Sequence, residues 1–169
     1  MTVLLLAYTV SFIDRTILAL LVEPLRRDLG LSDTEISLLQ GLAFAIFYCT
    51  MSIPIASLSD RKSRRGIIAV GIFFWSLATA ACGLATTFWR LFAARLCVGI
   101  GEATLSPATY SLVGDLFPER LRGRALGFFA SGIHIGAGLA LIVGGAVVGL
   151  ASSMGAIATP IGELRSWQV

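Results

Sequence analysis

The sequence has little charge, little histidine and little cysteine for its length. Only 14% of its 169 residues are charged, whereas soluble domains carry about 25%. There is only one histidine, and no two of the three cysteines (Cys49, Cys82 and Cys97) form a C-x-x-C pair. The sequence therefore predicts neither a zinc site nor a disulfide framework. The run Gly99–Gly101 lacks the third glycine of a dinucleotide motif and lies within an apolar stretch. We therefore expect no metal, no cofactor and no enzymatic activity.

What the sequence does contain is apolar. Hydrophobic residues make up 56% of it, and the mean hydropathy is +0.86. Five segments are long enough to cross a bilayer core of about 30 Å, which takes about 20 helical residues. They cover residues of about 3–22, 36–58, 66–86, 91–113 and 125–150, and a sixth helix is expected to begin near Arg165-Ser166-Trp167. The sequence therefore predicts an all-α transmembrane fold with the lipid bilayer as a partner.

A polar stretch, Glu23–Glu35, separates the first two segments. Pro24 is expected to end the first helix, because proline lacks the backbone N–H that an α-helix needs. Ser32 and Glu35 have the spacing of a capping box, in which each side chain accepts a hydrogen bond from the other residue's backbone. We therefore expect the second helix to begin there.

The basic residues are concentrated in two short loops. One follows the second segment and the other follows the fourth, and together they hold Arg61, Lys62, Arg64, Arg65, Arg120, Arg122 and Arg124. Basic residues accumulate on the cytoplasmic side of membrane proteins. We therefore expect a multi-pass protein of the cell membrane (inner or plasma membrane) with its N-terminus in the cytoplasm. The net charge of +3 then reflects topology, and no nucleic-acid partner is expected.

The third and fifth segments differ in the surfaces they present. Residues 67–86 carry no charge, so most of the third helix is expected to face lipid. The fifth helix has a stripe of small residues that lets another helix approach closely. The stripe comprises Gly127, Ser131, His134, Gly138 and Gly145. His134 has two interpretations, a packed and hydrogen-bonded side chain or a proton relay that lines a cavity.

Four ionisable residues lie at bilayer depth, Asp14 and Arg15 in the first segment and Arg95 and Glu102 in the fourth. A charge at the bilayer centre costs about 2.5–3.5 kcal/mol on insertion scales. Each of the four therefore needs a partner, a wet cavity or a neutral form. Residues seven apart share a helix face, since they are separated by about 700°. We expect the Arg95–Glu102 face, continued by Ser106 and Thr109, to line a cavity or to pair with the first helix.

These residues have two possible roles. They could form an inert ion-pair network that fixes helix register, or they could form a substrate or proton pathway. A carboxylate beside an arginine can change its protonation when the arginine moves. The second hypothesis assigns proton binding to Glu102, with Asp14 as the rival. Phe44, Phe47 and Tyr48 would then supply part of the cavity wall.

The segment Ala56–Arg65 (ASLSDRKSRR) resembles the signature loop of the major facilitator superfamily. In that family the aspartate and arginines of this loop form a cytoplasmic charge clamp, which the resemblance assigns here to Asp60, Arg61 and Arg64. Arg95–Glu102 (RLCVGIGE) resembles the family's fourth-helix motif, whose arginine is linked to proton coupling.

Within this superfamily the sequence is most similar to spinster-like transporters. The resemblance is carried by Phe12–Arg15, Gly101–Ala103, Ser106-Pro107 and Asp115–Pro118. It implies twelve helices in two halves, and alternating access with proton-linked movement of small organic or lipid-like solutes. Residues 1–169 would then be an incomplete N-terminal bundle, a fragment that lacks a C-terminal half and is inactive alone. The alternative is a truncated membrane protein that does not transport, or a module that binds a partner in place of that half.

Overall fold

The computed structural model describes residues 1–154, 157–159 and 162–164, and nearly all of them are helical. The segment from Arg165, where a sixth helix is expected, lies outside the described residues. The first apolar segment forms α1 (Thr2–Leu20), followed after one residue by α2 (Val22–Leu29). Pro24 lies in the first turn of α2, where its missing N–H would otherwise bond to Leu20. Proline thus interrupts the helix as expected, but much of the connection expected to be a loop is helical.

The second apolar segment is one long helical rod. It consists of α3 (Asp33–Ser37), a π-helical turn η1 (Leu38–Leu42) and α4 (Ala43–Arg61). The predicted capping box is confirmed at its start. The Ser32 hydroxyl accepts the Glu35 backbone N–H at 3.3 Å, and the Glu35 carboxylate accepts the Ser32 backbone N–H at 2.9 Å. The third segment, α5 (Arg64–Gly83), is unbroken.

The fourth segment differs from the single helix expected over about 91–113. It forms α6 (Phe88–Glu102) and α7 (Leu105–Leu116), separated at Ala103 and Thr104. Pro107 causes the break, because it cannot donate to the carbonyl of Ala103 and its ring crowds that carbonyl. The Thr104 hydroxyl instead donates to the carbonyl of Gly101 at 2.8 Å.

The fifth segment forms α8 (Glu119–Leu139), a second π-helical turn η2 (Ala140–Gly144) and α9 (Gly145–Met154). A short antiparallel pair follows, β1 (Ile157–Thr159) and β2 (Gly162–Leu164), in which Ala158 lies opposite Glu163. Within the described residues, four helical spans are long and apolar enough to cross a membrane. They are Thr2–Leu20, Asp33–Arg61, Arg64–Gly83 and Glu119–Leu150, and the remaining apolar segment is the one that Pro107 divides.

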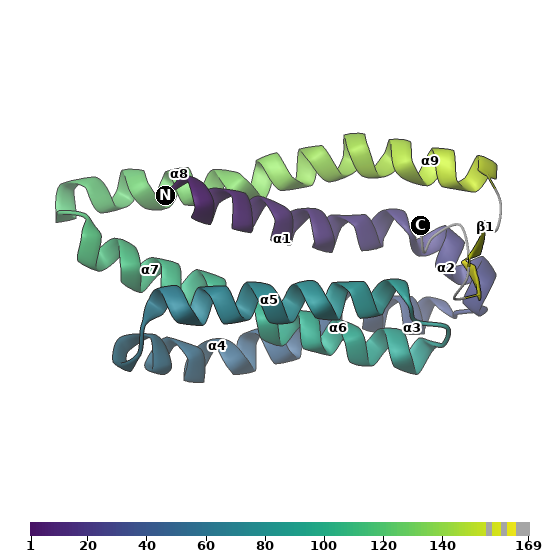
Figure 1. Ribbon diagram of the computed structural model, residues 1–169, viewed down its shortest axis with the longest axis horizontal. Coiled ribbons are helices and arrows are strands. Elements are labelled where there is room, and N and C mark those ends of the chain that lie inside the picture. The colour runs from purple at the N-terminus through teal and green to yellow at the C-terminus, as the bar shows by residue number, and fades with distance from the viewer. Residues whose placement is uncertain (155–156, 160–161, 165–169) are drawn as a thin grey trace.

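The helices are arranged in two groups (Figure 1). In one group α1 runs along α8, and in the other α5, α6 and α4 lie together. Glycine allows close approach in the first group, since a Cβ added at Gly136 would lie 2.5 Å from the Thr9 carbonyl oxygen. Between the groups lies an apolar cluster that includes Tyr8, Trp75 and Phe129. The bundle is therefore held by small residues within one group and by large ones between the groups.

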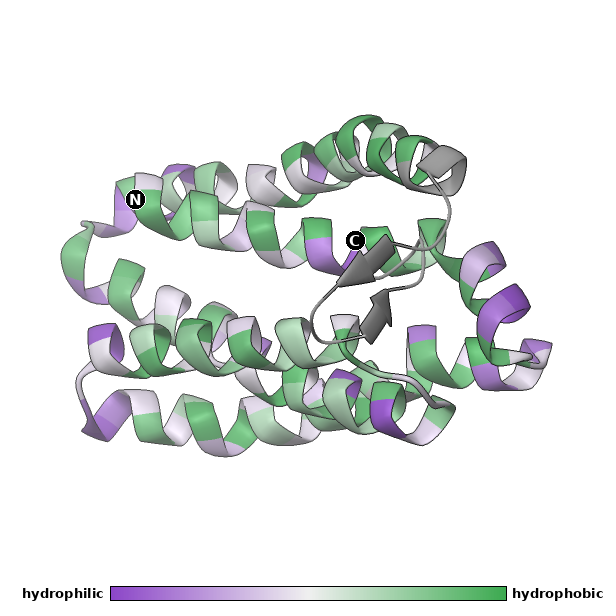
Figure 2. Ribbon diagram, turned by 45° about the vertical axis from the view of Figure 1, so that its right-hand side comes forward, coloured by the Kyte–Doolittle hydropathy of each residue, from purple (hydrophilic) through white to green (hydrophobic). Residues whose placement is uncertain are grey.

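The outer surface of α5 is apolar. Val70, Phe73 and Leu77 are exposed along one side of this helix, while Gly71 and Trp75 on the other side are buried. The other long helices are also mostly hydrophobic (Figure 2), and large apolar side chains such as Val3 of α1 and Ile53 of α4 are exposed on them. A surface of this kind fits a bilayer, as the charge-free third segment predicts.

The close contacts of α8 use other glycines than the predicted stripe. Gly132 and Gly136 pack against α1, whereas Gly127 and Gly138 have no neighbour within 4 Å of a built Cβ among the described residues. His134 lies with the latter and is exposed. The glycines of the predicted stripe therefore make no close helix contact among the described residues.

Candidate functional site

The four ionisable residues at bilayer depth come together between α1 and α6. An Arg15 Nη atom lies 2.6 Å from Glu102 Oε2, and Arg15 Nε donates to the same oxygen at 2.7 Å. Arg95 Nη1 lies 3.2 Å from Asp14 Oδ2. Two adjacent residues of α1 thus pair with two residues of α6 that are two turns apart. Each ion pair links the group that contains α1 to the group that contains α6.

The site is buried to different depths. The Glu102 side chain is 0% exposed and that of Arg95 5%, whereas those of Asp14 and Arg15 are 15% and 24% exposed. Removing one member of a buried ion pair typically costs about 3–5 kcal/mol, because the other charge is left unpaired. The Ser11 hydroxyl also donates to Glu102 Oε2, at 2.6 Å. Three donor groups therefore converge on one carboxylate oxygen, while Glu102 Oε1 has no partner among the described residues.

Three aromatic rings surround the Arg15 guanidinium. Its Cζ lies 4.8 Å from the ring centre of Phe12, 4.3 Å from that of Phe44 and 4.9 Å from that of Tyr48. A cation within about 6 Å of an aromatic face is attracted to it, more strongly where water is excluded. Arg15 therefore has a second set of partners besides Glu102.

A cavity of about 420 Å³ extends from this aromatic cage between α4 and α7. The hydroxyls of Tyr48 and Ser106, both predicted to line a cavity, are 3.3 Å apart on its wall. Ser52, Tyr110 and Ser111 add further hydroxyls, and Asp60 also lines the cavity. His134 is not among the lining residues and stays a prediction for this role.

The predicted charge clamp lies at the end of the bundle that carries the basic loops. Arg64 Nε donates to the Ser111 hydroxyl at 2.7 Å, and Arg64 also forms an ion pair with Asp115. The Ser111 hydroxyl lies 3.4 Å from Asp60 Oδ1. Asp60 and Arg64 thus meet on α7, whereas Arg61 is exposed.

Several residues of the site were not found by sequence reasoning. Ser11 was missed because a serine in an apolar helix usually bonds to its own backbone. Ser111 and Asp115 were missed as clamp partners because they lie about fifty residues away from the loop they contact. Pro107 is the one local signal near them, since it ends α6 and so directs α7. Among the described residues no cluster of histidine, cysteine or carboxylate side chains could hold a metal ion.

Fold and site together define a multi-pass helical membrane protein in which two ion pairs link α1 to α6. Residues 4–165 match the family model of the Major Facilitator Superfamily. The chain belongs to this superfamily, and its relatives make it spinster-like.

Two curated relatives and one solved structure show the likeness. The probable L-galactonate transporter of Escherichia coli K12 is 36% identical over 80% of this chain and 30% of its own length. The sphingosine-1-phosphate transporter of Mus musculus is 34% identical over 86% of the chain and 27% of its own length. A bacterial homologue of the human lysosomal transporter spinster, in an inward-facing and occupied conformation, superposes with a TM-score of 0.87 at 36% identity. The superposition covers 98% of this chain and 38% of that one.

The chain therefore spans roughly a third of the length of the proteins it matches. The matched relatives are named as transporters, and none of these three names describes an enzyme.

Proposed function

We propose that this chain is the N-terminal half of a proton-coupled secondary transporter, which moves small organic or lipid-like solutes by alternating access. The proposal rests on the two ion pairs between α1 and α6, Asp14–Arg95 and Arg15–Glu102. Ionisable residues inside a membrane are expensive, and their usual role is in substrate or proton pathways. Catalysis needs reacting groups that this site does not bring together, so we assign it no enzymatic role.

Glu102 is the proposed proton-binding group, and Asp14 is its rival. Protonation would remove the charge that holds Arg15 at 2.6 Å from Glu102. The guanidinium would keep its contacts with Phe12, Phe44 and Tyr48, which do not depend on the carboxylate. Proton binding would therefore loosen α1 from α6 without leaving Arg15 unpartnered.

The proposed solute carries an anionic group. L-galactonate and sphingosine-1-phosphate, named as solutes of two relatives, share an acidic group although one is sugar-like and the other lipid-like. Arg15 is the more exposed arginine of the site and adjoins Tyr48, which lines the hydroxyl-bearing cavity. Tyr48 and Ser106 would contact the solute there. His134 lies outside this cavity, exposed on α8, and would line the solute path only where a second half faces α8.

A second half is needed for this mechanism. Alternating access rocks two bodies around one site, and the chain matches about a third of the length of its relatives. We place the N-terminus and both basic loops in the cytoplasm of a cell-membrane protein. Asp60, Arg61 and Arg64 would act there as the clamp that biases one conformation.

The decisive experiment is Glu102→Gln in the transporter formed by this chain and its C-terminal half. Glutamine keeps an oxygen for Ser11 and Arg15 but cannot take up the proton. We expect proteoliposomes to lose accumulation of solute driven by a pH gradient while retaining solute exchange without a gradient. Asp14→Asn, tested in the same way, distinguishes Glu102 from its rival.

Two outcomes would contradict the proposal. Unchanged gradient-driven uptake by the Glu102→Gln protein would remove Glu102 from proton coupling. Proton-driven flux by the chain alone in liposomes would show that it needs no second half, whereas solute binding without flux is the expected result. A chain that folds but binds no solute, alone or with the other half, would support a non-transporting membrane module.

A further inference from the structure

A further cavity lies beside the second basic loop, where α7 meets α8. It measures about 300 Å³ and is lined by Met1, Phe117, Leu121, Arg124, Ala125 and Phe128. Figure 1 shows the start of α1 beside α8 near this turn. Arg124 is the one charged side chain among the lining residues, and the others are apolar. The volume lies at the lower end of the range for small-molecule sites, about 300–1,000 Å³.

The three arginines of this loop differ in their partners. Arg122 donates to the backbone carbonyls of Phe117 at 3.1 Å and Gly114 at 2.8 Å, so it holds the turn together. Arg120 and Arg124 are exposed and have no hydrogen bond or ion pair among the described residues. They lie in the first two turns of α8, whereas cations stabilise a helix at its C-terminal end. Helix stability therefore does not explain their position.

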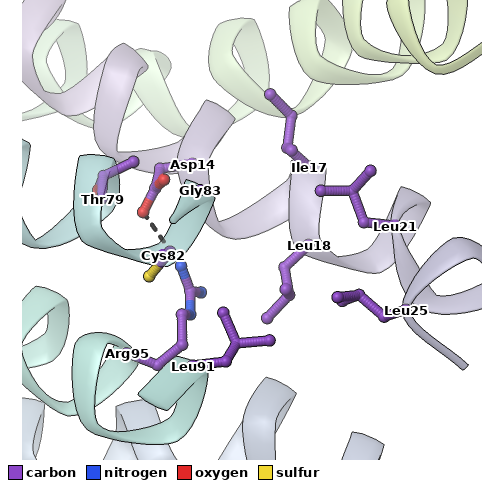
Figure 3. A pocket seen from close by; sticks show the side chains of 10 residues that line it. All are labelled: Asp14, Ile17, Leu18, Leu21, Leu25, Thr79, Cys82, Gly83, Leu91 and Arg95. Atoms are coloured by element: carbon purple, nitrogen blue, oxygen red, sulfur yellow. Dashed lines mark hydrogen bonds and ion pairs between the residues drawn. The ribbon is translucent and has the colours of Figure 1, made fainter. Parts of the chain in front are cut away.

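The charge of Arg124 is not balanced within the described part of the chain. Figure 3 shows the contrasting case, a smaller cavity in which Arg95 points toward Asp14 and forms an ion pair with it. Near the turn between α7 and α8, Asp115 already forms an ion pair with Arg64. The guanidinium of Arg124 is therefore available to a ligand from outside these residues.

An acidic phospholipid matches both parts of this cavity. Its phosphate can accept charge-assisted hydrogen bonds from a guanidinium, and its glycerol and acyl chains can pack on the apolar walls. Phe128 is 46% exposed although it is aromatic, and an exposed apolar patch beside a charge is typical of a membrane contact. A free anion would use the arginine but leave the apolar walls uncovered. The combination therefore favours a lipid over a soluble anion.

We propose that the cavity between the start of α1 and α8 binds the headgroup of an acidic phospholipid. Arg124 contacts the phosphate, Arg120 adds a second positive charge one turn away, and Phe128 covers the start of the acyl chains. Basic loops stay in the cytoplasm, where acidic lipids give the leaflet its negative surface potential, so the lipid belongs to that leaflet. The site does not depend on the proposed transport, because binding requires neither a gradient nor Glu102.

Native mass spectrometry of the purified chain in detergent measures this binding directly. With phosphatidylglycerol and phosphatidylcholine at equal concentration, we expect the first bound lipid to be mainly phosphatidylglycerol. Arg124→Gln should weaken that binding about fivefold, the contribution of one basic residue near a membrane surface. Arg124→Lys keeps the charge and should weaken it less. The matched control is Arg65→Gln, an exposed arginine of the other basic loop that does not line the cavity, and it should leave binding unchanged.

The apolar wall is tested separately. Phe128→Ala should weaken the binding of phosphatidylglycerol about threefold or more, because the ring no longer covers the lipid. Leu139→Ala is the control, since Leu139 is 42% exposed at the far end of α8 and does not line the cavity. Inorganic phosphate in molar excess should not displace the lipid. All of these variants change exposed side chains, so their unfolding temperatures without added lipid should match that of the unchanged chain.

The inference fails if the chain binds the two lipids equally. It also fails if Arg65→Gln weakens binding as much as Arg124→Gln, because a basic surface would then attract acidic lipid without a site. Displacement by inorganic phosphate would make the ligand a free anion. The same measurement on the transporter formed by this chain and its C-terminal half should keep the preference for phosphatidylglycerol. Its loss there would show that the second half covers the cavity in place of a lipid.

Discussion

At the scale of single residues, the Asp14–Arg95 pair links two helices that belong to different groups. The Arg95 side chain is nearly fully buried, and that of Asp14 is 15% exposed. Because a buried charge without its partner is more costly than no charge at all, the two residues should be energetically coupled.

We predict that Asp14→Asn lowers thermal stability more than the double change Asp14→Asn with Arg95→Gln. The single change leaves the Arg95 guanidinium without its carboxylate, at a cost of about 3–5 kcal/mol by comparison with other buried pairs. The double change removes both charges. A double-mutant cycle of unfolding temperatures in detergent measures the coupling, with Arg26→Gln and Asp33→Asn, an exposed pair, as the control. Additive effects for Asp14 and Arg95 would mean that the pair contributes nothing.

Sequence reasoning found the charges of the site but not their pairing. Asp14, Arg15, Arg95 and Glu102 stand out because charges at bilayer depth are costly. Which carboxylate meets which arginine depends on the separation and rotation of α1 and α6, which no local pattern encodes. The Phe12–Arg15 contact is local, but the approach of Phe44 and Tyr48 to the same cation also depends on helix packing.

At the scale of helices, prolines account for two of the interruptions. Pro24 and Pro107 each remove a backbone donor next to a break. The sequence predicts the break at Pro24, whereas the segment that contains Pro107 was expected to be one continuous helix. The π-helical turns η1 and η2 follow no such signal in the sequence. The packing face of α8 was also not predictable, since glycines lie on two opposite sides of this helix and only Gly132 and Gly136 meet α1.

We predict that Gly136→Leu disrupts the packing of α1 on α8, whereas Gly138→Leu does not. A Cβ at Gly136 would meet the backbone oxygen of Thr9, which cannot move without shifting α1. Overpacking typically costs about 1–3 kcal/mol. Thermal unfolding followed by size-exclusion chromatography should show the loss for Gly136→Leu alone. Equal stability of the two variants would mean that the backbones of α1 and α8 do not approach each other closely at Gly136.

At the scale of the whole molecule, both basic loops and the N-terminus lie at one end of the bundle (Figure 1). The sequence predicts this arrangement, because an even number of crossings separates the N-terminus from each basic loop. The other end carries α2 and the loop between α5 and α6, where basic and acidic residues are mixed.

We predict that the end carrying α2 faces the outside of the cell. In a chain without its native cysteines, Lys62→Cys would report on one end and Thr86→Cys on the other. An impermeant maleimide should label Thr86→Cys on intact cells and Lys62→Cys only after permeabilisation, because basic loops stay in the cytoplasm. Labelling in the reverse order would mean that the basic loops face the outside of the cell.

The two ion pairs between α1 and α6 also restrict how α1 can move. Asp14 and Arg15 are adjacent in sequence, so their side chains leave the helix about 100° apart. A spin of α1 about its own axis that eased one pair would strain the other. The two pairs together act as a torsional lock, and α1 can turn relative to α6 only after one of them has opened. Neutralising either carboxylate would release that rotation while the surviving pair served as its pivot.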